Sequence, residues 1–271
     1  MHLGRMVFAQ IIDLLPRKRF QTLVSRFHGD YKNRGFSCFD PLLTMIFAQL
    51  TYCESLRDIE ACLSAQPAHL YHLGIRGNIR RSTMSDANES RDARIFKGLA
   101  QILMTQARDL YVDDTISVDL DAVVYAFDST TISLCLAIFP WARFRRRKAA
   151  VKLHTLIDLR GNIPTFILVS SRKMHDVLAL DHLLIEAGAF YLIDKGYIDY
   201  ERLYGLATAC AYFVTRLKDN AQYHVVESRQ VDKRTGLLCD QIIRLTGGTS
   251  TTDYPANLRR VKYRDLDTRD V

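Results

Sequence analysis

The spacing of apolar residues changes near residue 116, and this change constrains the fold more than any other feature of the sequence. Segments 8–15 and 19–27 carry apolar residues three and four positions apart, which is typical of amphipathic helices. From Val123 to Phe127 the chain has five consecutive residues of the kind that buried strands favour. We therefore predict an α+β or α/β fold, with a helical region over 1–115 and a mixed β-sheet over 116–271.

The helical region contains two basic residues beside a turn. Helices are expected to begin at Asp40-Pro41, at Ser55 and at Ser82, and the last of them is expected to continue through Leu103. Arg80 and Arg81 directly precede that last helix. Short helices joined by a basic, Gly-containing turn are typical of helix-turn-helix DNA-binding domains. They are equally typical of a helical bundle with solvated arginines, and the spacing favours neither interpretation.

The second region has a characteristic order of strands and helices. Strand-like runs at 152–158 and 163–170 flank Leu159-Arg160-Gly161-Asn162, which predicts a β-hairpin. The elements expected after the hairpin are a helix at 176–187, a strand at 190–193, a helix at 200–209 and a strand at 211–215. This order resembles the opening of a ribonuclease H-like mixed sheet. From about residue 219 the chain becomes polar and β-rich, which indicates an insertion.

Two aspartates follow apolar strands that would be neighbours in such a sheet. Asp128 comes directly after the run 123–127, and Asp194 directly after the run 190–193. Carboxylates at adjacent strand ends repel one another unless a cation lies between them, and oxygen ligands favour Mg²⁺ or Mn²⁺. Such ions activate a water or a 3′-hydroxyl for attack on a phosphodiester. The alternative is that each aspartate caps a turn, but the pair favours a catalytic metal site.

A run of basic residues lies between the first of these strands and the hairpin. No acidic residue occurs from Ser129 to Ile157, and the segment contains Arg143, Arg145, Arg146, Arg147, Lys148 and Lys152. We interpret these residues, with Arg80 and Arg81, as contacts to DNA phosphates, although such a run can also be a solvated loop. His175-Asp176 could form hydrogen bonds near the site, or Asp176 could cap a helix. His154 and Asp158 on the hairpin are weaker candidates for chemistry.

The composition narrows the classes of protein that the chain can belong to. The formal net charge of +7 makes an anionic partner plausible without naming one. No apolar stretch approaches the roughly 20 residues that a bilayer requires, and no secretory signal is recognisable at the start. The 6 cysteines include no CxxC pair, so we expect reduced thiols in a cytoplasmic protein without a zinc site.

Three long strings resemble the DDE transposases of bacterial insertion sequences, in the IS-four group. They are RSTMSDANESRDARIFKGL at 81–99, YAFDSTTISLCLAIFPWARFRRRKAAVKLHTLIDLRGNIPTFI at 125–167 and HDVLALDHLLIEAGAFYLIDKGYIDYERL at 175–203. The resemblance implies a ribonuclease H-like core in which Asp128 and Asp194 are the first two acids of the catalytic triad. It also implies Mg²⁺- or Mn²⁺-dependent cleavage at transposon ends and strand transfer. The implied partners are double-stranded DNA, as terminal repeats and target, and a second copy of the chain in a homodimer.

The third acid of that family has no counterpart that we can assign. It is a glutamate on a helix after the insertion, within a Tyr-Arg-Glu-Lys signature. Neither Glu201 nor Glu227 has this signature around it, and the chain stops at Val271. We therefore expect a C-terminally truncated transposase that lacks the last core helix and has impaired activity. The alternatives are a DNA-binding inhibitor of a full-length transposase and a nuclease of the same fold.

Overall fold

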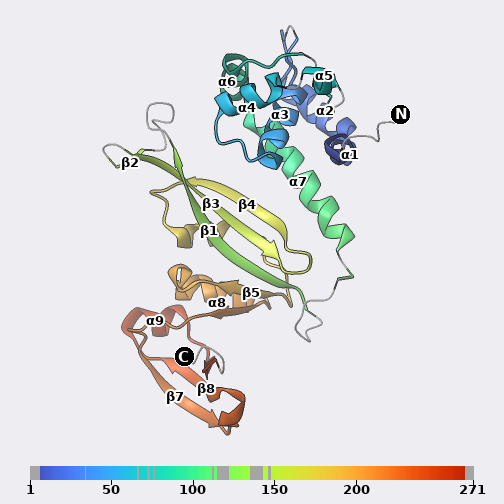
Figure 1. The fold of residues 1–271 in the computed structure, drawn as a ribbon. Coiled ribbons are helices and arrows are strands. Elements are labelled where there is room, and N and C mark those ends of the chain that lie inside the picture. Colours follow the sequence, from blue (N-terminus) through green and yellow to red (C-terminus); the bar gives the residue numbers. More distant parts are fainter. Residues whose placement is uncertain are drawn as a thin grey trace. The chain divides into compact units, whose positions relative to one another are not determined.

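The structure is a computed structural model that describes residues 7–33, 35–65, 67–71, 74–75, 77–111, 113–114, 122–134, 143–145 and 148–265 (Figure 1). The chain forms two compact units, Met1–Ala107 and Arg108–Val271. The predicted boundary at 115/116 lies outside the described residues, and it stays a prediction. No helix in the described part is long and apolar enough to cross a membrane.

Unit 1 consists of helices in the part that is described. They are α1 (Val7–Asp13), α2 (Arg17–Arg26), α3 (Phe39–Leu50), α4 (Leu56–Ser64), α5 (Pro67–Leu70), α6 (Arg81–Ser90) and α7 (Ala93–Leu110), whose last turn belongs to unit 2. One buried cluster joins α3, α4 and α6 through Leu43, Leu63 and Met84. A second joins α2 to α7 through Phe20 and Leu99, as the three- and four-residue spacing predicts.

The helix predicted to run from Ser82 through Leu103 is two helices in the structure. Arg91 between α6 and α7 has an extended backbone, with φ −77° and ψ 139°. Its guanidinium donates hydrogen bonds to the carbonyl oxygens of Gly29 and Phe36, at 2.6 and 2.7 Å. The Asp92 carboxylate then accepts the backbone N–H of Arg94 at 2.8 Å, so it caps the start of α7. The prediction of one continuous helix was therefore wrong at Arg91 and Asp92.

Unit 2 is built on a sheet with the strand order β2-β3-β1-β5-β6, in which β4 pairs with β3 (Figure 1). The strands are β1 (Val124–Leu134), β2 (Arg143–Arg145), β3 (Lys148–Asp158), β4 (Ile163–Ser171), β5 (Phe190–Ile193) and β6 (Tyr212–Thr215). Strands β1, β3 and β4 are antiparallel to one another in turn, whereas β1, β5 and β6 run parallel. Helices at the N-terminus followed by this mixed sheet confirm the predicted α+β, ribonuclease H-like fold class.

The hairpin predicted between β3 and β4 is present, and its turn depends on glycine. Gly161 has φ +68° and Asn162 has φ +54°, a backbone region that glycine enters without steric cost. A Cβ on Gly161 would lie 2.5 Å from ring atoms of Tyr111. The turn therefore requires glycine both for its backbone conformation and for this close approach.

The segment predicted as a helix at 176–187 is shorter and more tightly wound. It forms the 3₁₀ helix η3 (Asp176–His182). Val177, Leu180 and Leu183 are buried at steps of three residues, while Leu184 is 93% exposed. Steps of three match the three residues per turn of a 3₁₀ helix. The burial pattern therefore fits the 3₁₀ helix that is present as well as the α-helix that was predicted.

The connections after β5 and the final sheet complete unit 2. The 3₁₀ helix η4 (Lys195–Tyr197) and helix α8 (Tyr200–Thr208) follow β5, and β6 then pairs with it. The β-rich segment expected from about residue 219 forms the three-stranded sheet β7 (Tyr223–Arg229), β8 (Leu237–Leu245) and β9 (Leu258–Tyr263), with η5 (Lys233–Thr235) and α9 (Gly248–Asp253). Leu245 and Tyr254 belong to the same buried cluster as Tyr191 and Leu203, so this sheet shares the core of unit 2.

Candidate metal and nucleic-acid site

Asp128 and Asp194 occupy equivalent positions on neighbouring parallel strands. The paired positions of β1 and β5 end with Phe127 opposite Ile193, and the two aspartates are the next residues of each strand. Neighbouring strands lie about 4.8 Å apart, so the two carboxylates start from adjacent backbone positions. Asp128 is exposed, and the side chain of Asp194 is 47% exposed. Both acids are thus accessible at the carboxyl end of β5, where open α/β sheets bind ligands.

One detail of the prediction for Asp128 was wrong. The apolar run 123–127 suggested that the strand ends there, but β1 continues to Leu134. The continuation pairs with β3, and Leu134 lies opposite Ala149. Asp128 therefore marks the point where β1 loses β5 as a neighbour, because β5 is a short strand of 4 residues. From Asp128 onward, β1 is paired with β3 but no longer with β5.

Arg216 is the third member of this row, and the sequence analysis missed it. The paired positions of β5 and β6 end with Ile193 opposite Thr215, so Arg216 is the next residue, beside Asp194. Its Nη2 lies 2.6 Å from Asp194 Oδ1. The guanidinium, with the backbone N–H groups of Lys195 and Gly196, holds the pKa of Asp194 below its usual range. The signal that could have found Arg216 is its place directly after an apolar strand, as for the two aspartates.

The opposite face of β1 carries a second polar cluster, made by Ser129, Lys152, His154 and Asp176. Successive residues of a strand point to opposite faces, so Ser129 faces away from Asp128. The Ser129 hydroxyl donates to Asp176 Oδ1 at 3.3 Å, and Lys152 Nζ donates to the same oxygen at 2.8 Å. His154 lies opposite Ser129 in the register, and its Nδ1 is 3.9 Å from Asp176 Oδ1. Asp176 therefore joins η3 to both β1 and β3.

Tyr197 connects the loop after Asp194 to β1. Its ring packs on Phe127 with centroids 5.0 Å apart, and it is 3% exposed. Its hydroxyl is buried without a hydrogen-bond partner of good geometry among the described residues. Burial raises the pKa of Tyr197 to about 12, and the carboxylates of Asp176, Asp128 and Asp194 add to this effect.

Comparisons with known proteins identify the family of this chain. Residues 119–267 match the model of the family described as "Transposase DDE domain". This chain belongs to the DDE transposase family. Residues 3–76 match a domain of unknown function (DUF4372). The predicted recognition of an insertion-sequence DDE transposase is confirmed.

Two curated relatives also carry the family's name. "Putative transposase y4zB" of Sinorhizobium fredii is 30% identical over 190 residues, which are 68% of this chain and 52% of the relative. "Probable transposase for insertion sequence element IS5377" of Geobacillus stearothermophilus is 27% identical over 144 residues, 53% of this chain and 38% of the relative. The chain thus spans about half the length, or less, of these relatives.

The predicted phosphate contacts of this DDE transposase family member fall into several parts of the structure. Arg80 and Arg81 are exposed at the start of α6 in unit 1. Arg143 and Arg145 lie in β2, and Lys148 begins β3. Arg146 and Arg147 lie outside the described residues. Lys152 is only 15% exposed and is paired with Asp176, so it has a protein partner that the sequence did not reveal. All of these phosphate contacts stay predictions.

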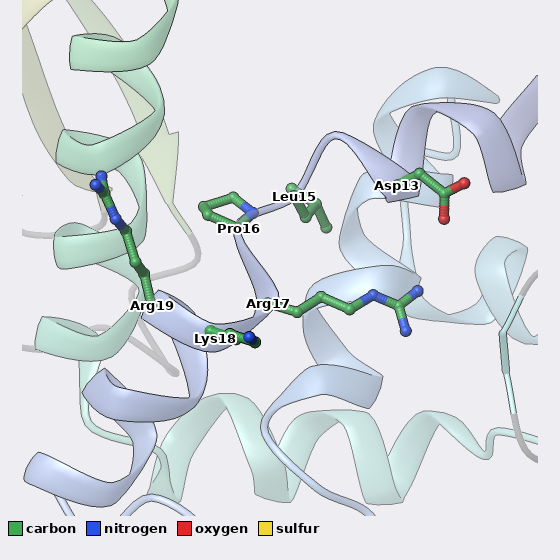
Figure 2. Close-up of a pocket in the computed structure, with 6 residues that line it drawn as sticks. All are labelled: Asp13, Leu15, Pro16, Arg17, Lys18 and Arg19. Atoms are coloured by element: carbon green, nitrogen blue, oxygen red, sulfur yellow. The ribbon is translucent and has the colours of Figure 1, made fainter.

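Figure 2 shows a pocket in unit 1 at the junction of α1 and α2. Its lining consists of Asp13, Leu15, Pro16, Arg17, Lys18 and Arg19. Arg17 also lies over the ring of Phe39, at 5.0 Å from its centroid. None of the residues predicted to bind metal or DNA lines this pocket.

The donor atoms of the row fit a magnesium-type ion. Proteins commonly hold Mg²⁺ through one or two carboxylates, while waters and substrate phosphates complete the coordination shell. Asp128 and Asp194 supply two such carboxylates at adjacent positions. Within the described ranges, no group of three or more His, Cys, Asp or Glu side chains could hold an ion. The site therefore fits an ion that is completed by water and phosphate oxygens.

Proposed function

We propose that this chain acts on DNA as an insertion-sequence transposase, with Asp128 and Asp194 as ligands of Mg²⁺ or Mn²⁺. The observation that carries the proposal is the register, because the positions after the Phe127–Ile193 pair are both aspartates. Membership of the DDE transposase family supports the same chemistry. Asp194 also caps η4, because its carboxylate accepts the Gly196 N–H at 3.4 Å, but both acids are exposed and so remain accessible to an ion.

A bound divalent ion would supply activation of the attacking water or 3′-hydroxyl and stabilisation of the leaving oxygen. The two aspartates place two negative charges next to each other. When no metal is bound, Arg216 forms an ion pair with the Asp194 carboxylate. Basic residues of β2 and β3, together with Arg80 and Arg81, would neutralise phosphates of the double-stranded DNA. With two carboxylates, metal binding is expected to be weak until phosphate oxygens complete the shell.

A second candidate function is DNA binding without cutting. The ion pair of Arg216 with Asp194, at 2.6 Å, favours this alternative because it neutralises one of the two carboxylates. Such a protein would hold transposon ends and compete with a complete transposase. Binding and cutting are therefore the two properties that must be measured separately.

The proposal is tested by cleavage of a supercoiled plasmid that carries the DNA flanking the gene, with Mn²⁺ present. We expect nicking or cutting by the wild type that is lost in Asp128→Asn and in Asp194→Asn. Asp232→Asn is the matched control, because Asp232 is also a partly exposed acid in an ion pair, with Arg234 at 2.9 Å. Cutting that persists in both site variants would contradict the proposal. If the wild type and the variants all bind the plasmid and none of them cuts it, the DNA-binding alternative is supported.

A further inference from the structure

The Lys152–Asp176 ion pair on the opposite face of β1 is largely shielded from solvent. The side chain of Lys152 is 15% exposed, that of Asp176 is 32% exposed, and that of His154 is fully buried. Desolvation offsets most of the attraction within a buried ion pair, so such a pair adds little net stability. What the pair can contribute is a fixed position for the groups attached to it.

The groups attached to Asp176 lie directly behind the candidate metal ligand. Ser129, which donates to Asp176 Oδ1, is the neighbour of Asp128 in the chain. Lys152 pairs with Thr131 in the register and donates to the same oxygen. Lys152 Nζ also donates to the carbonyl oxygen of Met174 at 3.3 Å, so the segment before η3 is held too. Asp176 thus bonds to β1 at Ser129 and to β3 at Lys152.

Asp176 is not itself placed as a ligand of the ion. It faces the side of the sheet opposite to Asp128, because it is bonded to Ser129. Lys152 neutralises its charge at 2.8 Å. No group of three acids in the described residues is close enough to hold an ion. Its effect on a metal ion must therefore act through the backbone of β1.

We propose that Asp176 and Lys152 are positioning residues that hold Ser129, and through it the Asp128 carboxylate, in the orientation that binds the divalent ion. This inference rests on the proposed function, since it presupposes that Asp128 is a metal ligand. Residues that orient a metal ligand from behind commonly change metal affinity by 10- to 100-fold when they are replaced. The chemistry that the pair serves is the capture of a hard divalent cation by a carboxylate on an exposed strand.

The test is Mn²⁺ binding to the full chain without DNA, measured as loss of the free-ion signal in electron paramagnetic resonance. We expect Asp176→Asn and Lys152→Met each to weaken Mn²⁺ binding about tenfold. The double variant should be no weaker than either single one, because both remove the same pair. Lys152→Arg keeps the charge and the donors, and it should bind within about twofold of the wild type.

Asp181→Asn is the matched control. Asp181 is another acid of η3 and pairs with Arg202 at 2.7 Å, away from β1. It should bind Mn²⁺ as the wild type does. Asp176→Asn and Lys152→Met that bind as well as Asp181→Asn, while Asp128→Asn does not bind, would overturn the inference and leave the proposed function intact. A wild type whose Mn²⁺ binding is unaffected by Asp128→Asn would overturn both.

A milder variant keeps the inference testable if Asp176→Asn fails to fold. Ser129→Ala removes one hydroxyl and leaves the Lys152–Asp176 pair in place. We expect it to weaken Mn²⁺ binding by about threefold and to lower the unfolding midpoint only slightly, because a single hydrogen bond to the Asp176 carboxylate is lost. Wild-type affinity in Ser129→Ala would count against a positioning role, whereas lower stability with unchanged affinity would indicate a purely structural one.

Discussion

Three residues share one row across neighbouring strands. Asp194 and Arg216 directly follow β5 and β6, and Asp128 is the first residue of β1 beyond its pairing with β5. The Arg216 guanidinium therefore partly neutralises the negative charge of the two aspartates. Arg216 therefore occupies an oxygen of Asp194 that a metal ion would use.

The first prediction concerns this competition. Arg216→Ala should raise the Mn²⁺ affinity of the DNA-free chain about two- to fivefold, which corresponds to the roughly 0.5–1 kcal/mol of an exposed ion pair. Titration with Mn²⁺ measures the effect. Arg234→Ala is the control, because Arg234 forms a similarly exposed pair with Asp232. An affinity that is unchanged in Arg216→Ala would mean that the arginine does not compete with the ion.

His154 leads to a prediction about pH. Burial lowers the pKa of His154, and the Asp176 carboxylate only partly opposes this effect. The unfolded chain binds a proton on this residue near its ordinary pKa of 6.5, whereas the folded chain does not until a lower pH. The stability that the neutral His154 provides is thus present above about pH 6.5 and is lost as the pH falls toward the lowered pKa.

The measurement is urea unfolding at several values between about pH 7 and pH 5, where histidine titrates. His154→Gln keeps a polar group for Ser170, which lies 2.9 Å from Nε2, but it does not titrate. Its free energy of unfolding should therefore fall less steeply with acid than that of the wild type. Equal slopes in the two proteins would contradict a lowered pKa for His154.

The sequence predicted part of this residue-scale organisation. Asp128 and Asp194 were identified because each follows an apolar run, and a run of that kind also precedes Arg216. Arg216 was missed because one basic residue after a strand has no distinctive chemistry by itself. For Asp176 the sequence left two interpretations open, since its partners Ser129 and Lys152 are 47 and 24 residues away in the chain.

The periodicity of apolar residues predicts some of the helices and strands correctly and others not. The order of strands and helices in unit 2 follows from apolar runs and from the turn at Gly161. The break between α6 and α7 lies in the polar stretch 88–92, where apolar periodicity gives no information about the backbone. Contacts of Arg91 with Gly29 and Phe36, 62 and 55 residues away, determine the break.

The prediction at this scale concerns Arg91. Arg91→Ala should lower the stability of unit 1 by about 2 kcal/mol, because it leaves two carbonyl oxygens without their charged donor. Thermal or urea unfolding of the full chain measures the loss. Arg94→Ala is the control: its side chain is 69% exposed and paired with Asp92, so a change below about 1 kcal/mol is expected. Equal effects of the two variants would show that the Arg91 contacts do not stabilise the break.

The whole chain combines two units that match two different family models, at 3–76 and 119–267. Unit 2 carries the proposed metal site and most of the predicted phosphate contacts, whereas unit 1 carries Arg80 and Arg81. The net charge of +7 is spread over both regions, so composition alone did not identify a DNA surface. Salt dependence can assign phosphate contacts to particular residues.

The prediction for the whole chain is a reduced salt dependence of DNA binding in the triple variant Arg145→Ala, Arg146→Ala, Arg147→Ala. The slope of log affinity against log salt should fall by about 0.9 for each phosphate contact that is lost. The control changes the same number of charges in the three-stranded sheet, at Arg229, Lys233 and Arg234. Identical slopes in the two triple variants would exclude residues 145–147 as a phosphate-binding segment.

The most direct test of the metal site is anomalous diffraction from crystals of the wild-type chain grown with Mn²⁺ and a short DNA duplex. The account predicts a strong anomalous peak bonded to one carboxylate oxygen of Asp128 and one of Asp194, with Arg216 displaced from Asp194. A peak at other side chains, or carboxyl groups of Asp128 and Asp194 on opposite faces of the sheet, would contradict it.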